Sequence, residues 1–259
     1  MPDALHSPGA AAYEPKGPGG RGAGQLSAAA DGVSPAAGSA PLRGEEQQRA
    51  ACGAWGGVVV IDAHPNPESL CAALAARYAD AARQGGADVT VLALRDLRFD
   101  PVLHQGYRGE QALEPDLRHA QQLIESCEHL CLVTPIWWGS VPALLKGFLD
   151  RAFQRGWAYR YLPNGRPLGL LAGRSARVLL STDSPGWYLR LLQGDPTVKG
   201  LVRSTLRFCG FAPVRLARFG PVHGSTPAAR QAWLERAARV GAADGRRRGT
   251  RPRPAAAAV

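Results

Sequence analysis

Short apolar runs alternate with longer amphipathic segments from residue 57 onward, and this alternation predicts strands separated by helices. The apolar runs lie at residues 58–62, 88–94, 129–134, 177–182 and 214–219. Continuous β-branched runs such as Val58–Ile61 are typical of strands buried on both faces, as in parallel sheets. Helices are expected at residues 70–84, 115–127, 142–151, 197–209 and 227–240.

Capping and turn residues mark where these elements begin and end. Ser69 is expected to cap the first helix, which stops at Gly85. Pro142 is expected in the first turn of its helix, where the missing N–H has no intrahelical partner to lose. The turn sequence at residues 163–165, flanked by alternating aromatic residues, predicts a hairpin or projecting loop within residues 156–173.

The order of these elements predicts the fold class. Strands that alternate with helices indicate an α/β fold, a doubly wound parallel sheet of five strands in three α/β/α layers. Five strands suit the flavodoxin-like strand order, in which a ligand binds between the first and third strands, where the order reverses.

The two ends of the chain differ in composition from its middle. Residues 1–54 are dominated by Ala, Gly, Pro and Ser and show no apolar periodicity, which predicts a disordered low-complexity segment. Residues 242–259 are expected to form a disordered basic tail. One compact folded domain is therefore expected at residues 55–241, and it keeps about +7 of the formal net charge of +10. Such a surface favours anionic partners, among them a phosphorylated cofactor, although a solvated basic surface explains it equally well.

The cysteine count and the hydropathy bear on metal binding, on the cellular compartment and on membrane insertion. The chain has five cysteines without the paired spacing of a metal site, so no metal ligands are predicted. An odd number of cysteines and the lack of an export signal indicate reduced thiols in the cytoplasm. No apolar stretch approaches the length of a membrane span, and we expect no nucleic-acid partner.

The first loop that carries candidate chemistry is His64–Cys71, between the first strand and the first helix. Free N–H groups and the helix dipole favour an anion at such a helix start. Ser69 is a candidate to donate its hydroxyl to a phosphate, and His64 is a candidate to contact a pyrophosphate or a ribityl chain. The loop has neither the Walker sequence nor the dinucleotide glycine pattern. A simple capped helix start is the alternative.

Two further loops follow the third and fourth strands. Residues 135–139 carry two adjacent indoles, and Trp138 is a candidate to cover a flat aromatic ligand whose polar edge binds backbone N–H groups. The alternative is that both indoles are core residues. Farther along the following helix, Lys146 and Arg151 are expected to face solvent or a partner subunit. In residues 181–188, small polar residues permit close approach to a ligand, and Trp187 and Tyr188 are candidates to roof a pocket.

Four motifs in this order resemble the flavodoxin-like NAD(P)H:quinone oxidoreductases, the DT-diaphorase family with its bacterial relatives. The motifs are His64–Ser69, Pro135–Phe148, the loop at Thr182, and Phe208–Phe211. The resemblance covers about residues 58–240, and the long second motif is its most specific part. It implies a homodimer that binds FAD or FMN and transfers a hydride from NAD(P)H through flavin N5 to a quinone, in a ping-pong mechanism.

The resemblance also implies roles for individual residues. The positions implied to hold the flavin phosphates and ribityl chain are His64, Ser69, Leu70 and Cys71. Those implied to lie along the isoalloxazine are Pro135, Ile136, Trp137, Trp138 and Gly139, and those at its pyrimidine edge are Thr182, Asp183 and Ser184. Trp187 and Tyr188 fall where family members carry a substrate-facing tyrosine.

The chain departs from the family pattern at two positions. Cys71 stands where many relatives have Asn, and Gln193 stands where the mammalian enzymes have a His proposed to relay a proton. Because an amide does not titrate, a relay would need another donor, such as Tyr188 or water.

Other functions fit part of the pattern. The resemblance also allows an ancillary regulatory subunit of a potassium-efflux transporter, docked through the basic tail, or a reductase of azo or nitro compounds. A small electron-carrier flavodoxin is disfavoured by the hairpin and by the basic charge.

Overall fold

The computed structural model describes residues 57–106, 109 and 111–249. Five parallel strands form its central sheet in the order β2-β1-β3-β6-β7. They are β1 (Val58–Asp62), β2 (Val89–Ala93), β3 (His129–Pro135), β6 (Ser175–Ser181) and β7 (Val214–Phe219). The order reverses between β1 and β3, so the predicted flavodoxin-like doubly wound sheet is confirmed.

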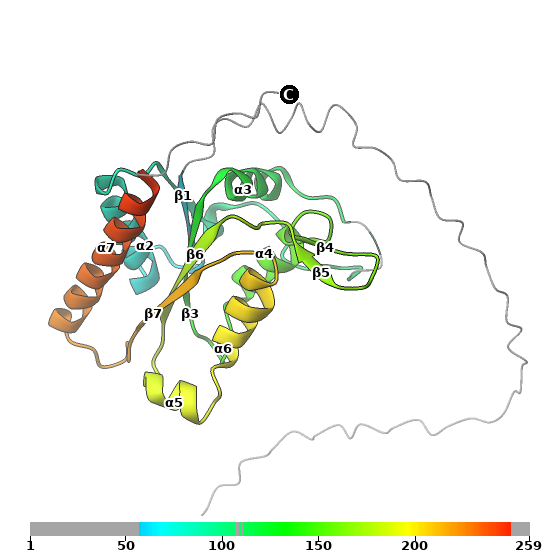
Figure 1. The fold of residues 1–259 in the computed structure, drawn as a ribbon. Helices are drawn as coiled ribbons and strands as arrows, with labels where there is room; N and C mark the ends of the chain where they lie inside the picture. Colours follow the sequence, from blue (N-terminus) through cyan, green and yellow to red (C-terminus); the bar gives the residue numbers. More distant parts are fainter. Residues whose placement is uncertain (1–56, 107–108, 110, 250–259) are drawn as a thin grey trace, which may run out of the picture. The chain divides into compact units, whose positions relative to one another are not determined.

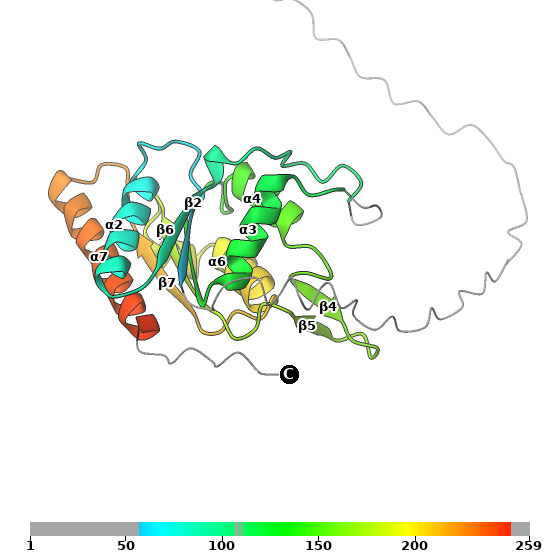
Figure 2. The ribbon, with the colours of Figure 1, turned by 90° about the horizontal axis from the view of Figure 1, so that it is seen from above.

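Helices cover both faces of this sheet (Figures 1 and 2). One face carries α2 (Leu70–Gln84) and α7 (Pro227–Gly249), and the other carries α3 (Pro115–Ser126), α4 (Ala143–Ala152) and the π-helix η2 (Lys199–Arg207). Alternate residues of β1 pack against the helices on the two faces of the sheet. Val58 and Val60 join the core under α2 and α7, whereas Val59 and Ile61 join the core under the other three helices.

Shorter elements connect these layers. They are the 3₁₀ turn η1 (Leu94–Asp96), the antiparallel hairpin β4 (Tyr159–Tyr161) and β5 (Pro167–Gly169), and the helices α5 (Gly186–Leu191) and α6 (Pro196–Val198). The hairpin is as predicted. Helix α5 was not predicted, because residues 186–191 were read as part of a loop. Among the helices described here, none has the length and apolar character needed to span a membrane.

The last helix is longer than the sequence indicated. It was expected to end at Val240, but α7 continues to Gly249 and packs along α2. A Cβ at Gly241 or Gly245 would lie 2.3 Å from a backbone oxygen of α2, so only glycine permits this close approach. Residues 242–249, which were expected to belong to the tail, therefore continue this helix. The predicted disordered N-terminal segment, residues 1–54, and the rest of the tail on which transporter docking depends, residues 250–259, lie outside the described residues.

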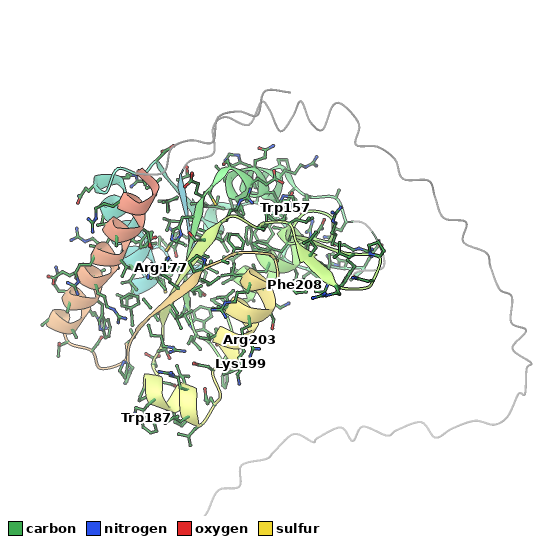
Figure 3. All side chains as sticks on the ribbon, in the orientation of Figure 1. Trp157, Arg177, Trp187, Lys199, Arg203 and Phe208 are labelled. Carbon is green, nitrogen blue, oxygen red and sulfur yellow. The ribbon has the colours of Figure 1, made fainter. Side chains whose placement is uncertain are left out.

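A buried carboxylate explains why this extension is ordered. The Oδ2 atom of Asp244 accepts hydrogen bonds from Tyr78 Oη at 2.8 Å and from Arg177 Nε at 2.5 Å. Nη2 of Arg177 donates to Oδ1 at 3.0 Å, and His129 Nε2 lies 3.3 Å from Oδ2. These partners come from α2, β6 and β3, and Figure 3 shows Arg177 between the sheet and α7.

The charges in this cluster stabilise one another. Burial alone would raise the pKa of Asp244, but the hydrogen bonds from His129 and Arg177 outweigh it and hold the pKa well below the usual value. Asp244 is thus a buried anion whose removal would leave the Arg177 guanidinium without a counter-charge.

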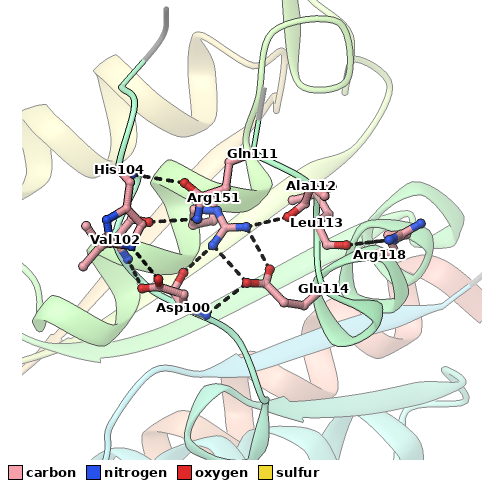
Figure 4. Close-up of polar contacts among 9 residues, drawn as sticks. All are labelled: Asp100, Val102, His104, Gln111, Ala112, Leu113, Glu114, Arg118 and Arg151. Carbon is pink, nitrogen blue, oxygen red and sulfur yellow. Dashed lines mark hydrogen bonds and ion pairs between the residues drawn. The ribbon is translucent and has the colours of Figure 1, made fainter. Parts of the chain in front are cut away.

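A second buried ion pair holds the irregular segment between β2 and α3 (Figure 4). Arg151 of α4 is fully buried, and its two Nη atoms donate to the Glu114 carboxylate at 3.1 and 2.9 Å. They also donate to the carbonyls of Asp100 and Ala112. The expectation that Arg151 faces solvent or a partner is wrong, because this excursion folds over α4 and supplies it with acceptors.

We predict that Asp244→Asn lowers the free energy of unfolding by about 3–5 kcal/mol, the usual cost of breaking a buried ion pair. The amide keeps the shape of the side chain but leaves the positive charge of Arg177 unpaired. Urea unfolding at pH 7, followed by circular dichroism, measures the difference.

Glu235→Gln is the matched control, since Glu235 is an exposed carboxylate on the same helix, and a change within about 0.5 kcal/mol is expected. Equal effects of Asp244→Asn and Glu235→Gln would contradict the assignment.

Because the folded-state pKa of Asp244 is depressed, its stabilisation is present above the unfolded pKa of about 3.9 and is lost as the pH falls below it.

Candidate functional site

The carboxyl ends of β1, β3 and β6 meet at one edge of the sheet, where two adjoining hollows of about 160 and about 560 Å³ open. The smaller hollow is lined by His64, Leu70, Cys71, Pro135, Ile136, Trp137, Ser181, Thr182, Asp183 and Val222. The larger is lined by Ile136, Trp138, Gly139, Thr182, Asp183, Ser184, Leu189, Gln193 and Pro196. The larger one falls within the roughly 300–1,000 Å³ that is usual for ligand sites.

A buried ion pair fixes the loop after β1. Asp62, at the end of the strand, is paired with Arg95 of η1 at 2.5 Å, and its other oxygen accepts the backbone N–H of His64 at 3.1 Å. The same Arg95 nitrogen reaches the His64 carbonyl at 3.3 Å. The backbone of His64 is thus held from both sides.

The imidazole of His64 is set in one tautomer. Its Nδ1 accepts the N–H of Asn66 at 3.0 Å, so Nε2 carries the proton of the neutral ring. Burial is the main cause that lowers the pKa of His64, which favours this neutral form. The ring lies edge-on to Trp137, with centroids 5.4 Å apart. His64 is therefore a hydrogen-bond donor at the smaller hollow.

The first turn of α2 offers backbone donors. The Ser69 hydroxyl oxygen accepts the N–H of Ala72 at 3.1 Å, which confirms the predicted N-cap. The N–H groups of Leu70 and Cys71 precede any intrahelical acceptor, and both residues line the smaller hollow. A helix start of this kind binds anions such as phosphate. Ser69 itself lines neither hollow.

Cys71 and Ser181 close the floor of the smaller hollow. Their Sγ and Oγ atoms are 3.2 Å apart in a buried contact between α2 and β6. Burial raises the pKa of the Cys71 thiol to about 12, so the thiol stays neutral and unreactive at physiological pH. It supplies shape and a weak hydrogen bond.

The two indoles after β3 sit on a tight turn. Trp137 and Ser140 exchange backbone hydrogen bonds at 3.0 and 2.8 Å, and the two residues between them have positive φ. Trp138, at φ 53°, is a bulky residue in the left-handed region, which is a strained position of the kind found at functional sites. Its side chain is 103% exposed, against 42% for Trp137. The interpretation of both indoles as core residues is therefore wrong.

The loop after β6 is tied to the loop after β7. The Thr182 N–H donates to the Phe219 carbonyl, and the Thr182 carbonyl accepts the N–H of Val222. Asp183 Oδ1 accepts the N–H of His223 at 2.7 Å. The Thr182 hydroxyl also accepts the N–H of Ser184 at 3.1 Å. These contacts hold residues 182–184 at the wall shared by the two hollows.

Most, but not all, of the predicted site residues come together. Trp187 and Tyr188 lie on α5, pack edge to face at a centroid distance of 6.0 Å, and line neither hollow. Gln193 lines the larger hollow. The position at which this chain has an amide in place of a titratable His therefore lies at the site. The described lining therefore contributes donors, apolar surface, a neutral amide and the carboxylate of Asp183.

Sequence reasoning missed three lining residues: Leu189, Pro196 and Val222. Val222 carried a usable signal, because it follows the fifth strand, whose carboxyl end must lie at the same edge. Leu189 and Pro196 belong to the short helices α5 and α6, which have no strand pattern to place them.

The chain is similar in sequence to a known family and to individual oxidoreductases. The family described as flavodoxin-like fold matches residues 57–242. An uncharacterized NAD(P)H oxidoreductase from Haemophilus influenzae is 29% identical over 185 residues, covering 70% of this chain and 91% of the relative. The ribosyldihydronicotinamide dehydrogenase (quinone) of Pongo abelii is 29% identical over 178 residues, covering 60% of this chain and 77% of the relative.

Among solved structures, an FMN-dependent NADH-azoreductase from Bacillus anthracis in complex with FMN has a TM-score of 0.54 at 18% identity. The match covers 72% of this chain and 99% of that one, and it shows a shared fold. Since the family match spans more than half of the chain, the resemblance drawn from the sequence motifs is confirmed: the chain belongs to the flavodoxin-like family, with the NAD(P)H:quinone oxidoreductases among its relatives.

Proposed function

We propose that this protein is a flavin-dependent NAD(P)H oxidoreductase that reduces quinones or related acceptors such as azo compounds. The observation that carries the proposal is the pair of adjoining hollows at the carboxyl edge of the sheet, one of which ends on the free N–H groups of α2. Relatives named NAD(P)H oxidoreductase and quinone dehydrogenase support the reaction class.

The donors and the apolar surface of the smaller hollow are the groups that a flavin needs, and we infer FMN because a structure of the same fold is an FMN complex. Its phosphate would be held by the N–H groups of Leu70 and Cys71 and by the Nε2–H of His64. Pro135, Ile136 and Trp137 would lie along the ring. When bound, the flavin supplies the redox chemistry, a hydride taken from NAD(P)H at N5 and delivered to the acceptor in a second half-reaction.

The protein contributes position and charge around that chemistry. Thr182, Asp183 and Ser184 form a loop fixed by hydrogen bonds, which would keep the polar edge of the ring in register. The neutral amide of Gln193 donates and accepts hydrogen bonds but does not relay a proton, so the proton for a reduced quinone would come from solvent or from Tyr188.

The function is tested by adding FMN to the purified chain and then NADPH without oxygen. We expect FMN to be retained through gel filtration and its visible absorption bands to bleach on addition of NADPH, then to return with a quinone. A protein that retains no flavin, or whose bound flavin stays oxidised, would contradict the proposal.

Truncating the indole in the smaller hollow tests where the ring binds. We predict that Trp137→Ala weakens FMN binding about tenfold, because it removes one stacking surface worth about 1–3 kcal/mol. Trp137→Phe should recover much of the affinity. Fluorescence titration of FMN measures both.

Val102→Ala is the control for this series, since Val102 is an exposed apolar residue outside both hollows. It should bind FMN like the unmodified chain. Unchanged FMN affinity in Trp137→Ala would place the ring elsewhere.

We further infer a homodimer that covers α5. Exposed apolar side chains gather on this helix and beside it: Trp187, Tyr188, Leu191 and Leu192. A monomer rarely exposes such a patch, and a second copy would shield it and bring Trp187 and Tyr188 toward an acceptor. Sedimentation should give a dimer, and Leu192→Glu should shift it toward a monomer. A monomer at micromolar concentration would contradict this inference.

We also infer a cytoplasmic location. It rests on the odd number of cysteines, and Cys71, Cys127, Cys131 and Cys209 are free thiols.

A further inference from the structure

The larger hollow ends beside a cation that the sequence motifs did not single out. Gln193 and Pro196 form this end of the lining, and the chain then enters η2 at Lys199. The ammonium nitrogen of Lys199 lies 3.2 Å from the point that a Cβ on Gly194 would occupy. Lys199 therefore stands at the rim of the hollow, over the turn that carries Gln193.

A second cation lies about one helical turn farther along. Arg203 is exposed, as Lys199 is, and Figure 3 shows the two side chains on the same part of η2. A π-helix such as η2 is rare and is frequently found at functional sites.

These two charges are not neutralised by the neighbouring acid. The carboxylate of Asp195 is paired with Arg218 at 2.5 Å. Within the described part of the chain, Lys199 and Arg203 take part in no ion pair within 4.0 Å. An uncompensated cation at the mouth of a ligand-sized hollow, with a second cation one helical turn away, favours an anionic group on the ligand.

We propose that Lys199 and Arg203 form a phosphate subsite for the pyridine nucleotide, an inference that rests on the proposed function. The nicotinamide has to reach the wall that the two hollows share, at Ile136 and Thr182. The remainder of the nucleotide then extends along the larger hollow toward Gln193 and Pro196, which brings its phosphates to the cations at the rim. Because the contacts are solvent-exposed, they are sensitive to salt.

The test compares three reductants: NADPH, NADH and reduced nicotinamide riboside, which has no phosphate. With a soluble quinone as acceptor, Lys199→Gln and Arg203→Gln should each raise the KM for the phosphorylated donors about three- to tenfold at low salt, with kcat unchanged. The KM for the riboside should not move. Arg207→Gln, which removes an exposed cation from the last turn of the same helix, is the matched control and should behave like the unmodified chain.

The comparison of NADPH with NADH also identifies which phosphate of the nucleotide the two cations bind. A larger effect with NADPH than with NADH assigns the 2′-phosphate, and equal effects assign the pyrophosphate. The inference is overturned if the riboside is affected as strongly as the dinucleotides, or if Arg207→Gln has the same effect as Lys199→Gln. If the unmodified chain oxidises none of the three donors, the proposed function fails with it, whereas normal oxidation that is unchanged in both variants overturns the phosphate subsite alone.

Discussion

The parallel direction of all five strands is the constraint on which the rest of the structure depends. Parallel neighbours need crossover connections, which place helices on both faces and bring every strand's carboxyl end to one edge. There the loops after β1, β3 and β6 meet. The free N–H groups of α2, the turn at Trp138 and the loop at Thr182 are consequences of that single arrangement.

Buried ion pairs then fix the loops and the last helix, whose positions the sheet alone does not determine. Asp62 and Arg95 hold the His64 loop at the functional edge, while Asp244 joins α7 to α2, β3 and β6. Arg151 and Glu114 hold the excursion before α3. In each case an exposed loop or terminal segment is tied to the core by a charge that is costly to bury alone, so its position is strongly specified.

The sequence predicted the local elements well and the long-range contacts poorly. The five strands, the Ser69 cap and the hairpin follow from short patterns of apolar and turn residues. The extension of α7 does not, because its arginines, alanines and glycines are typical of a disordered tail, and only the partners of Asp244 from distant elements reveal it as ordered. Arg151 was misplaced for the same reason. At the site, the residues next to strand ends were identified, whereas Leu189 and Pro196 lie on the short helices α5 and α6, which the apolar pattern does not place.

The central claim is that a flavin binds in the smaller hollow, and a crystal structure of the chain with FMN tests it most directly. The account predicts the phosphate within hydrogen-bond distance of the N–H groups of Leu70 and Cys71, with the ring between Trp137 and the loop at Thr182. FMN bound at another place, or a hollow that stays empty at saturating FMN, would contradict it.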